Sequence, residues 1–192
     1  MLDYKVLENE LNSIEDVRIF YFTKHMLFQL PNYFYHIPAS STGKYHPRYA
    51  LGDGGLARHV KAAVMIAQEL FKMEEYNFTQ YQKDIIISAL LVHDGYKQGF
   101  DEAGRTVSEH PIICFKQIMK ENFLCLILSP ITAIRIAFAV LTHMGQWNKN
   151  WDGKWIMPKP VTKLQKFVHL CDYLASRKFL EVNFKKEEEE QK

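Results

Sequence analysis

Apolar residues recur at three- and four-residue steps over most of the chain, which is the spacing of amphipathic helices. Starting at Leu56, for example, Val60, Val64 and Ala67 fall on one helical face. Helices are expected at about 56–71, 80–93, 107–120, 131–143 and 161–180. No stretch shows a convincing strand pattern, so the sequence predicts an all-α fold with a bundle of about five core helices.

The remaining segments complete a single expected domain over 1–192. Residues 1–55 are expected to hold one or two short N-terminal helices and then a long irregular loop, because prolines and glycines punctuate 31–55. A loop of this length without regular structure is usually functional or mobile. Residues 56–180 form the expected helical core, where Thr162 and Gln165 have the spacing of a capping box. Residues 181–192 form a charged tail that we expect to be solvated.

The composition is that of an ordinary globular domain. Apolar residues make up 47% and charged residues 24% of the 192 residues. A net charge of +2 gives no long-range attraction for duplex nucleic acid. The three cysteines form no CxxC pair, the N-terminus lacks a signal-peptide pattern, and no apolar run reaches about 18 residues. We therefore expect a cytoplasmic protein that does not enter a membrane, and a homo-oligomer stays open.

Histidine and aspartate stand near the ends of the expected helices. His93 and Asp94 follow directly on the apolar run IIISALLV. Burying such ionisable groups costs free energy unless they are paired or bind a metal. The other expected core helices also each carry such a residue, and these are His59, His110, His143 and Asp172.

These residue types suit divalent metal ions. Imidazole and carboxylate bind ions such as Mn, Fe, Co, Ni, Mg or Zn, and in helical bundles such ligands converge from facing helices. The two oxygens of Asp94 could bridge two ions. Two metal ions a few ångströms apart lower the pKa of a bridging water and clamp a phosphoryl group. The order H, HD, H, H, D along the chain therefore predicts a site for two divalent metal ions.

The same order is carried by the stretches GGLARHV, ALLVHDGYK, SEHP, LTHMGQW and HLCDYLASR, over about 54–178. In these stretches the chain resembles the HD-domain superfamily of metal-dependent phosphohydrolases, and among them the small bacterial or phage-type members. The resemblance implies a helical bundle that hydrolyses a phosphoester of a nucleotide, a cyclic nucleotide or a short oligonucleotide. It implies core metal ligands at His59, His93, Asp94 and Asp172, and second-metal ligands at His110 and His143.

Several basic residues are candidates for binding a phosphorylated substrate. The loop SSTGKYHPRY offers hydroxyls, backbone N–H groups and cations, which can hold phosphate by charge-assisted hydrogen bonds. By the resemblance, Lys97 in HDGYK contacts substrate phosphate, and it joins Asp94 as a candidate catalytic residue. The candidate substrate-binding residues are Lys44, His46, Arg48, Arg58 and Arg177.

Other histidines and the tryptophans receive structural interpretations. His169 lies about one helical turn before Asp172, where it either supports the site or packs. The histidines that we do not expect to bind metal are His25, His36 and His46. The tryptophans that we expect to cap the bundle core, rather than to line a substrate pocket, are Trp147, Trp151 and Trp155.

Two alternatives to a phosphohydrolase stay open. The same set of ligands serves di-iron oxygenases of HD type, which cleave C–C or C–P bonds with O₂, so the ligands alone do not separate the two chemistries. A binding module that keeps the fold without turnover is the other alternative. The complete set of ligands argues against that module, because a silent member would be expected to lose ligands.

Overall fold

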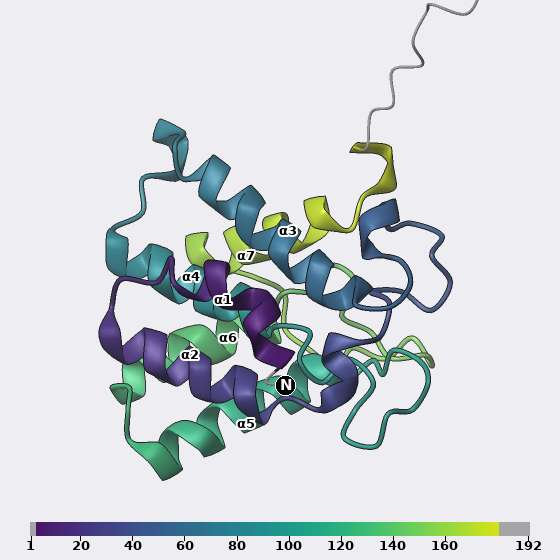
Figure 1. Cartoon of the computed structure of the whole chain (residues 1–192), viewed down its shortest axis with the longest axis horizontal. Helices are drawn as coiled ribbons and strands as arrows, with labels where there is room; N and C mark the ends of the chain where they lie inside the picture. Colours follow the sequence, from purple (N-terminus) through teal and green to yellow (C-terminus); the bar gives the residue numbers. More distant parts are fainter. Residues whose placement is uncertain (1–2, 181–192) are drawn as a thin grey trace, which may run out of the picture.

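The computed structural model describes residues 3–180 as a bundle of helices, without a strand in that part of the chain (Figure 1). A single antiparallel bridge joins Lys149 and Trp155. The predicted all-α class is confirmed. The α-helices are α1 (Glu8–Leu11), α2 (Val17–Gln29), α3 (Gly55–Leu70), α4 (Gln80–Val92), α5 (His110–Cys125), α6 (Pro130–Leu141) and α7 (Lys163–Ala175). Short 3-10 turns lie at Asp3–Leu7, Asn32–Tyr35, Arg48–Ala50, Glu74–Tyr76 and Lys178–Leu180.

Helix α4 is the centre of the bundle. Every residue from Asp84 to Val92 is buried, as expected of a helix that is apolar on all sides. It packs against α2, α3, α6 and α7, while α3 lies beside α7 and α5 beside α6 (Figure 1). Its one buried acid, Asp84, accepts the backbone N–H of Asp16 at 2.8 Å and thereby ties the start of α2 to the core. The central helix is therefore held by four neighbouring helices and by the start of α2.

The ends of the predicted helices are partly confirmed. The capping box of Thr162 and Gln165 is present at the start of α7. The helix expected at about 107–120 instead runs from His110 to Cys125, because the Val107 carbonyl accepts the His110 N–H in a turn before the helix. Helix α7 ends at Ala175 and not near 180. There the chain leaves the helix, and the Lys178 N–H donates to the Tyr45 carbonyl at 2.7 Å.

The segment 31–55 is more ordered than expected. Two 3-10 turns interrupt it, and its backbone bonds to itself from Ala39 N–H to the Ala50 carbonyl at 3.0 Å. Phe34 and Ala50 are completely buried. The segment is therefore packed on the start of α3, beside His59.

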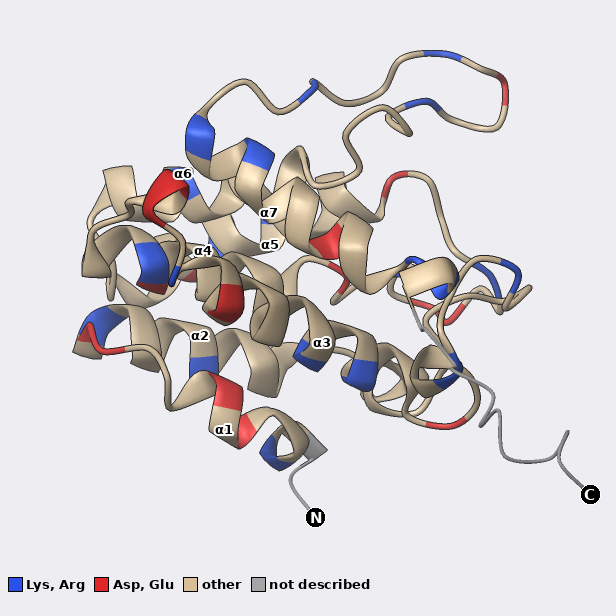
Figure 2. Ribbon diagram, turned by 90° about the horizontal axis from the view of Figure 1, so that it is seen from above, with Lys and Arg blue, Asp and Glu red and all other residues tan. Residues whose placement is uncertain are grey.

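Charged residues are spread over the described surface, with lysine and arginine interspersed with aspartate and glutamate (Figure 2). None of the helices in 3–180 combines the length and the apolar character that crossing a membrane requires. The predicted charged tail, 181–192, lies outside the described residues.

Gly55 sets how closely segment 31–55 can approach α3. A Cβ atom there would lie 2.3 Å from the carbonyl oxygen of Ala50 and 3.0 Å from the Cα of Pro38. Because both neighbours are backbone, we expect Gly55→Ala to lower the free energy of unfolding by about 2 kcal/mol or more. Urea unfolding followed by circular dichroism measures this loss.

Gly52→Ala is the matched control. Gly52 has a φ of +67° and open space around it, so its substitution should cost about 1 kcal/mol from backbone strain alone. Equal losses in the two variants would show that the contact with Ala50 does not limit the packing of the segment.

Candidate metal centre

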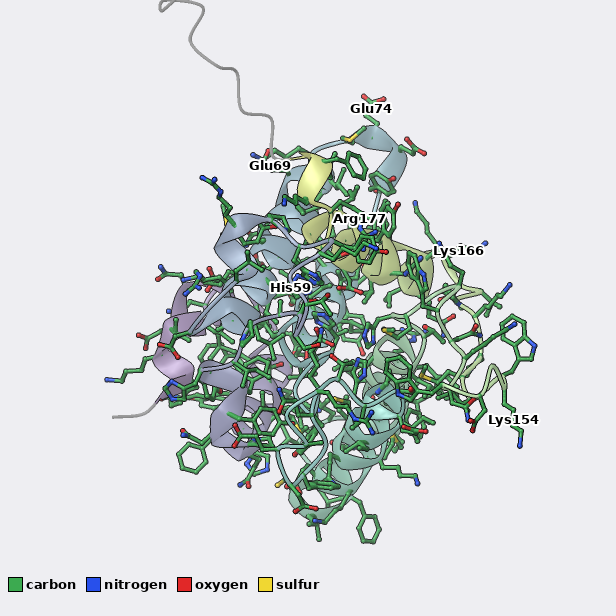
Figure 3. All side chains as sticks on the ribbon, turned by 90° about the vertical axis from the view of Figure 1, so that its right-hand side faces the viewer. His59, Glu69, Glu74, Lys154, Lys166 and Arg177 are labelled. Carbon is green, nitrogen blue, oxygen red and sulfur yellow. The ribbon has the colours of Figure 1, made fainter. Side chains whose placement is uncertain are left out.

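Five core helices bring six histidine and aspartate side chains together at one end of α4. His59 lies in the first turns of α3, and His93 and Asp94 continue from the last residue of α4. The others are His110 at the start of α5, His143 just after α6 and Asp172 in α7. All but Asp172 are at most 1% exposed. His59 lies near the middle of the molecule, surrounded by other side chains (Figure 3).

Asp172 is the meeting point of the first group of ligand atoms. Its Oδ1 lies 3.0 Å from His59 Nε2 and 3.4 Å from His93 Nε2. The side chain of Asp172 is 17% exposed, so this group has an edge toward solvent. His59, His93 and Asp172 could together hold one metal ion, with ligand atoms within 4.8 Å of one another.

Asp94 joins this group to a second one. Its Oδ2 faces His93 Nε2 at 3.5 Å and His59 Nε2 at 3.8 Å. Its Oδ1 faces His110 Nε2 at 3.0 Å and His143 Nε2 at 3.6 Å. His93, Asp94 and His143 form a second set of three that could hold a metal ion. One carboxylate thus lies between two groups of imidazoles, with one oxygen toward each.

Backbone carbonyls determine which ring nitrogen each of three histidines turns to the centre. Nδ1 lies 2.7 Å from the carbonyl oxygen three residues earlier in His93, His110 and His143. A carbonyl only accepts, so Nδ1 carries the proton, and Nε2 of the neutral ring has a free lone pair. Holding Nδ1 in this way is how proteins orient a histidine that binds a metal.

The centre contains more acceptors than the described protein atoms can satisfy. His93 Nε2 and Asp94 Oδ1 are buried and have no hydrogen-bond partner in 3–180. His110 Nε2 and His143 Nε2 lie 3.3 Å apart, and neither has a proton to donate when both rings are neutral. Buried lone pairs that face one another are stabilised by a cation between them. The residues therefore fit divalent metal ions.

The charges of the centre agree with that fit. Burial by itself would raise the pKa of Asp94, yet the Lys97 ammonium and the surrounding histidines hold this pKa well below its usual range. Burial would also raise the pKa of Asp172, but its histidine neighbours keep this pKa well below the usual range. Burial lowers the pKa of His110, which keeps this ring neutral at pH 7. Burial by itself would lower the pKa of His93, but the Asp94 and Asp172 carboxylates outweigh it and raise this pKa.

Lys97 lies directly on the centre. Its Nζ contacts Asp94 Oδ2, and its side chain is 12% exposed. The resemblance implied that Lys97 contacts substrate phosphate. In the structure its ammonium lies on the carboxylate between the two imidazole groups.

The other predicted substrate residues lie in different surroundings. His46 is brought to the centre, with its ring 5.5 Å from that of His59, and burial together with His59 and Lys97 lowers its pKa to about 4. The Arg58 guanidinium instead donates to the carbonyls of Tyr49 and Leu51, so it braces segment 31–55.

Arg177 and Lys44 lie near aromatic rings at the edge of the site. The Arg177 guanidinium lies 4.6 Å from the centre of the Tyr173 ring, next in sequence to Asp172, and 5.8 Å from that of Tyr45. Lys44 is exposed, with Nζ 5.2 Å from the same Tyr45 ring. Arg48 is exposed in the 3-10 turn Arg48–Ala50.

A cavity of about 280 Å³ opens beside the centre, and His110 forms part of its wall. Sequence reasoning missed most of its polar lining, although Ser108 stands in the SEHP stretch two residues before His110 and could have been found there. The other lining residues are Thr106, Met144, Trp147, Lys149, Asn150 and Trp151.

The expectation that the tryptophans cap the core is wrong. Trp147, Trp151 and Trp155 are 45%, 78% and 60% exposed. Their loop follows α6, where polar and glycine residues keep the chain at the surface. Two of the three tryptophans line the cavity instead.

His169 contacts the backbone of His143, one of the ligands in the second group. Its Nδ1 lies 2.6 Å from the backbone carbonyl of His143. A Cβ atom at Gly145 would lie 2.2 Å from the His169 ring, so only glycine lets the segment after His143 approach this closely. Trp147 stacks on Tyr173 with ring centres 5.6 Å apart and so joins the same segment to α7.

No family model, curated protein or solved structure matches this chain.

Asp94→Asn tests the centre. The amide keeps the size of the side chain but loses the charge and one acceptor between the two imidazole groups. We expect metal content to fall from about two ions per chain to less than one, because both positions use this carboxylate. Elemental analysis after gel filtration measures the content, and circular dichroism should show the helical signal retained.

Asp101→Asn is the matched control, because Asp101 is an exposed acid of the loop that follows Lys97. It should retain the metal content of the unmodified chain. Full metal content in Asp94→Asn would contradict the bridging role.

Proposed function

We propose that this chain is a metal-dependent phosphohydrolase of the HD-domain superfamily, with two divalent metal ions as cofactors. The supporting observation is the position of Asp94, whose two carboxylate oxygens face two separate pairs of imidazole Nε2 atoms. Nitrogen and carboxylate ligands of this kind suit Mn, Fe, Co, Ni, Mg or Zn. The three unpaired cysteines agree with a cytoplasmic location.

When bound, a pair of metal ions would supply a water of lowered pKa and polarise the phosphoryl oxygens. The protein groups would orient and hold these ions. His93, His110 and His143 present Nε2 because backbone carbonyls hold their Nδ1 protons. The Lys97 ammonium offsets part of the negative charge of Asp94. Because it lies beside this carboxylate, it would also attract an oxygen of a phosphate bound at the metal ions.

A phosphorylated substrate agrees with the surroundings of the centre. The cavity beside His110 offers the Ser108 and Thr106 hydroxyls and the Lys149 ammonium, which can bind phosphate oxygens. The exposed Trp147 ring provides an apolar wall on which a base can stack. We therefore propose a nucleotide, a cyclic nucleotide or a short oligonucleotide as substrate.

The deciding experiment combines elemental analysis with a screen of phosphoesters under Mn, Mg, Fe, Co, Ni and Zn. We expect about two metal ions per chain and metal-dependent release of phosphate or nucleoside monophosphate. Two iron ions with O₂-dependent turnover and no phosphoester hydrolysis would favour the oxygenase. Bound metal without any turnover would favour a binding module.

Lys149→Gln tests the cavity as the substrate site. Loss of one ammonium near the phosphate should raise KM about ten-fold and leave kcat nearly unchanged, because the residue binds substrate without touching the metal ligands. Steady-state kinetics on the best substrate of the screen measures both constants.

Lys154→Gln is the control, since Lys154 lies in the same loop but at the outer edge of the molecule (Figure 3). An equal rise of KM in both variants would place substrate binding elsewhere and reduce the role of Lys149 to general charge.

A further inference from the structure

A second group of potential ligands lies between α2 and α5, in residues that the metal centre does not use. Glu121 and Cys125 are four residues apart in α5 and so project from one face of that helix. His25 projects from α2 toward them. The ligand atoms of these three side chains lie within 4.8 Å of one another. From the sequence we did not expect His25 to bind a metal, because its two neighbours lie 96 and 100 residues away in the chain.

The geometry is that of chelation and not of a catalytic relay. In a cysteine–histidine–acid relay the thiol and the acid contact different nitrogens of the imidazole. Here Glu121 Oε2 lies 2.8 Å and Cys125 Sγ lies 3.7 Å from the same atom, His25 Nε2. A sulfur, a nitrogen and an oxygen thus converge on one point.

The separations are close to those that zinc requires. Tetrahedral zinc, with bonds of about 2.3 Å to sulfur and about 2.0 Å to nitrogen, holds these two atoms about 3.5 Å apart. The observed separation of Sγ and Nε2 is 3.7 Å. The Glu121 carboxylate would withdraw by a few tenths of an ångström to admit the ion. The other oxygen of this carboxylate lies 3.8 Å from the Lys120 ammonium, whose side chain is 62% exposed and can follow the movement.

The position of the group favours an exchangeable ion. Cys125 is exposed, whereas Cys114 and Cys171 are buried. The side chains of His25 and Glu121 are 27% and 14% exposed. Three protein ligands with an open fourth position describe a zinc site that keeps a water or an external ligand. A thiolate also distinguishes this group from the nitrogen and oxygen ligands around Asp94, because sulfur favours zinc over Mg or Mn.

We propose that His25, Glu121 and Cys125 form a second, surface metal site that binds Zn²⁺ and links α2 to α5. The thiol of Cys125 releases its proton to solvent when zinc binds, and a solvent water takes the fourth position. The site does not depend on the proposed phosphohydrolase function, because it shares no residue with the metal centre.

Protection of Cys125 from modification tests this site. The chain is first freed of metal with a chelator, and a thiol reagent is then added with and without Zn²⁺. Cys125 is expected to be the reactive thiol, because burial raises the pKa of Cys114 to about 12 and also raises that of Cys171. Zn²⁺ should slow modification of the Cys125 peptide, followed by mass spectrometry, about ten-fold or more.

Three variants separate this site from other causes of protection. His25→Ala and Glu121→Gln should lose most of the protection, whereas Asp94→Asn should retain it. Protection that persists in His25→Ala, or no protection in the unmodified chain, would overturn the proposal. Loss of protection in Asp94→Asn would also overturn it, since zinc would then act through the buried centre.

Cobalt offers a readout that does not depend on thiol reactivity. Co²⁺ bound at this site should give a thiolate-to-cobalt absorption band in the near ultraviolet, and Cys125→Ser should remove that band along with about one ion per chain. A band of unchanged intensity in Cys125→Ser would place the bound thiolate elsewhere and contradict the assignment.

Discussion

The carboxylate of Asp94 is ionised and almost completely buried, and such a group is tolerated inside a protein only when cations or strong donors surround it. Four imidazoles and the Lys97 ammonium enclose it. His93 and Lys97 adjoin Asp94 at the end of α4, but the other three imidazoles come from α3, α5 and the end of α6, so these segments have to meet at one place. The packing of the core around α4 provides that meeting place, because the buried helix holds His93 and Asp94 at its end while the other helices pack against its sides.

The irregular segments complete the site. Segment 31–55 is packed on the start of α3 and brings His46 beside His59. The loop after α6 turns at Gly145, where the close approach of His169 holds the His143 carbonyl. These segments lie at the surface, yet close contacts fix them to helices that carry ligands. The same arrangement leaves the cavity beside His110 open to solvent. The centre is therefore accessible from one side.

The two clusters of ligands differ in chemistry and in setting. The buried cluster offers imidazole and carboxylate only, whereas the cluster of His25, Glu121 and Cys125 adds sulfur and lies at the surface. Hard or borderline ions suit the first, and zinc suits the second. Burial also makes the first cluster part of the core, since its charges need one another or a metal to stay there. The second could lose its ion without leaving a buried charge.

The sequence alone predicted the helical class and the approximate positions of the core helices, because the apolar period of a helix is a local property. It also identified the six histidine and aspartate ligands of the centre as one set, because burying ionisable groups beside apolar runs costs free energy unless they have a partner. Contacts between distant segments became visible only in the folded structure. It turned Arg58 to backbone carbonyls, exposed Trp147 and brought His25 to Cys125. Such pairings depend on how helices pack, which no local pattern records.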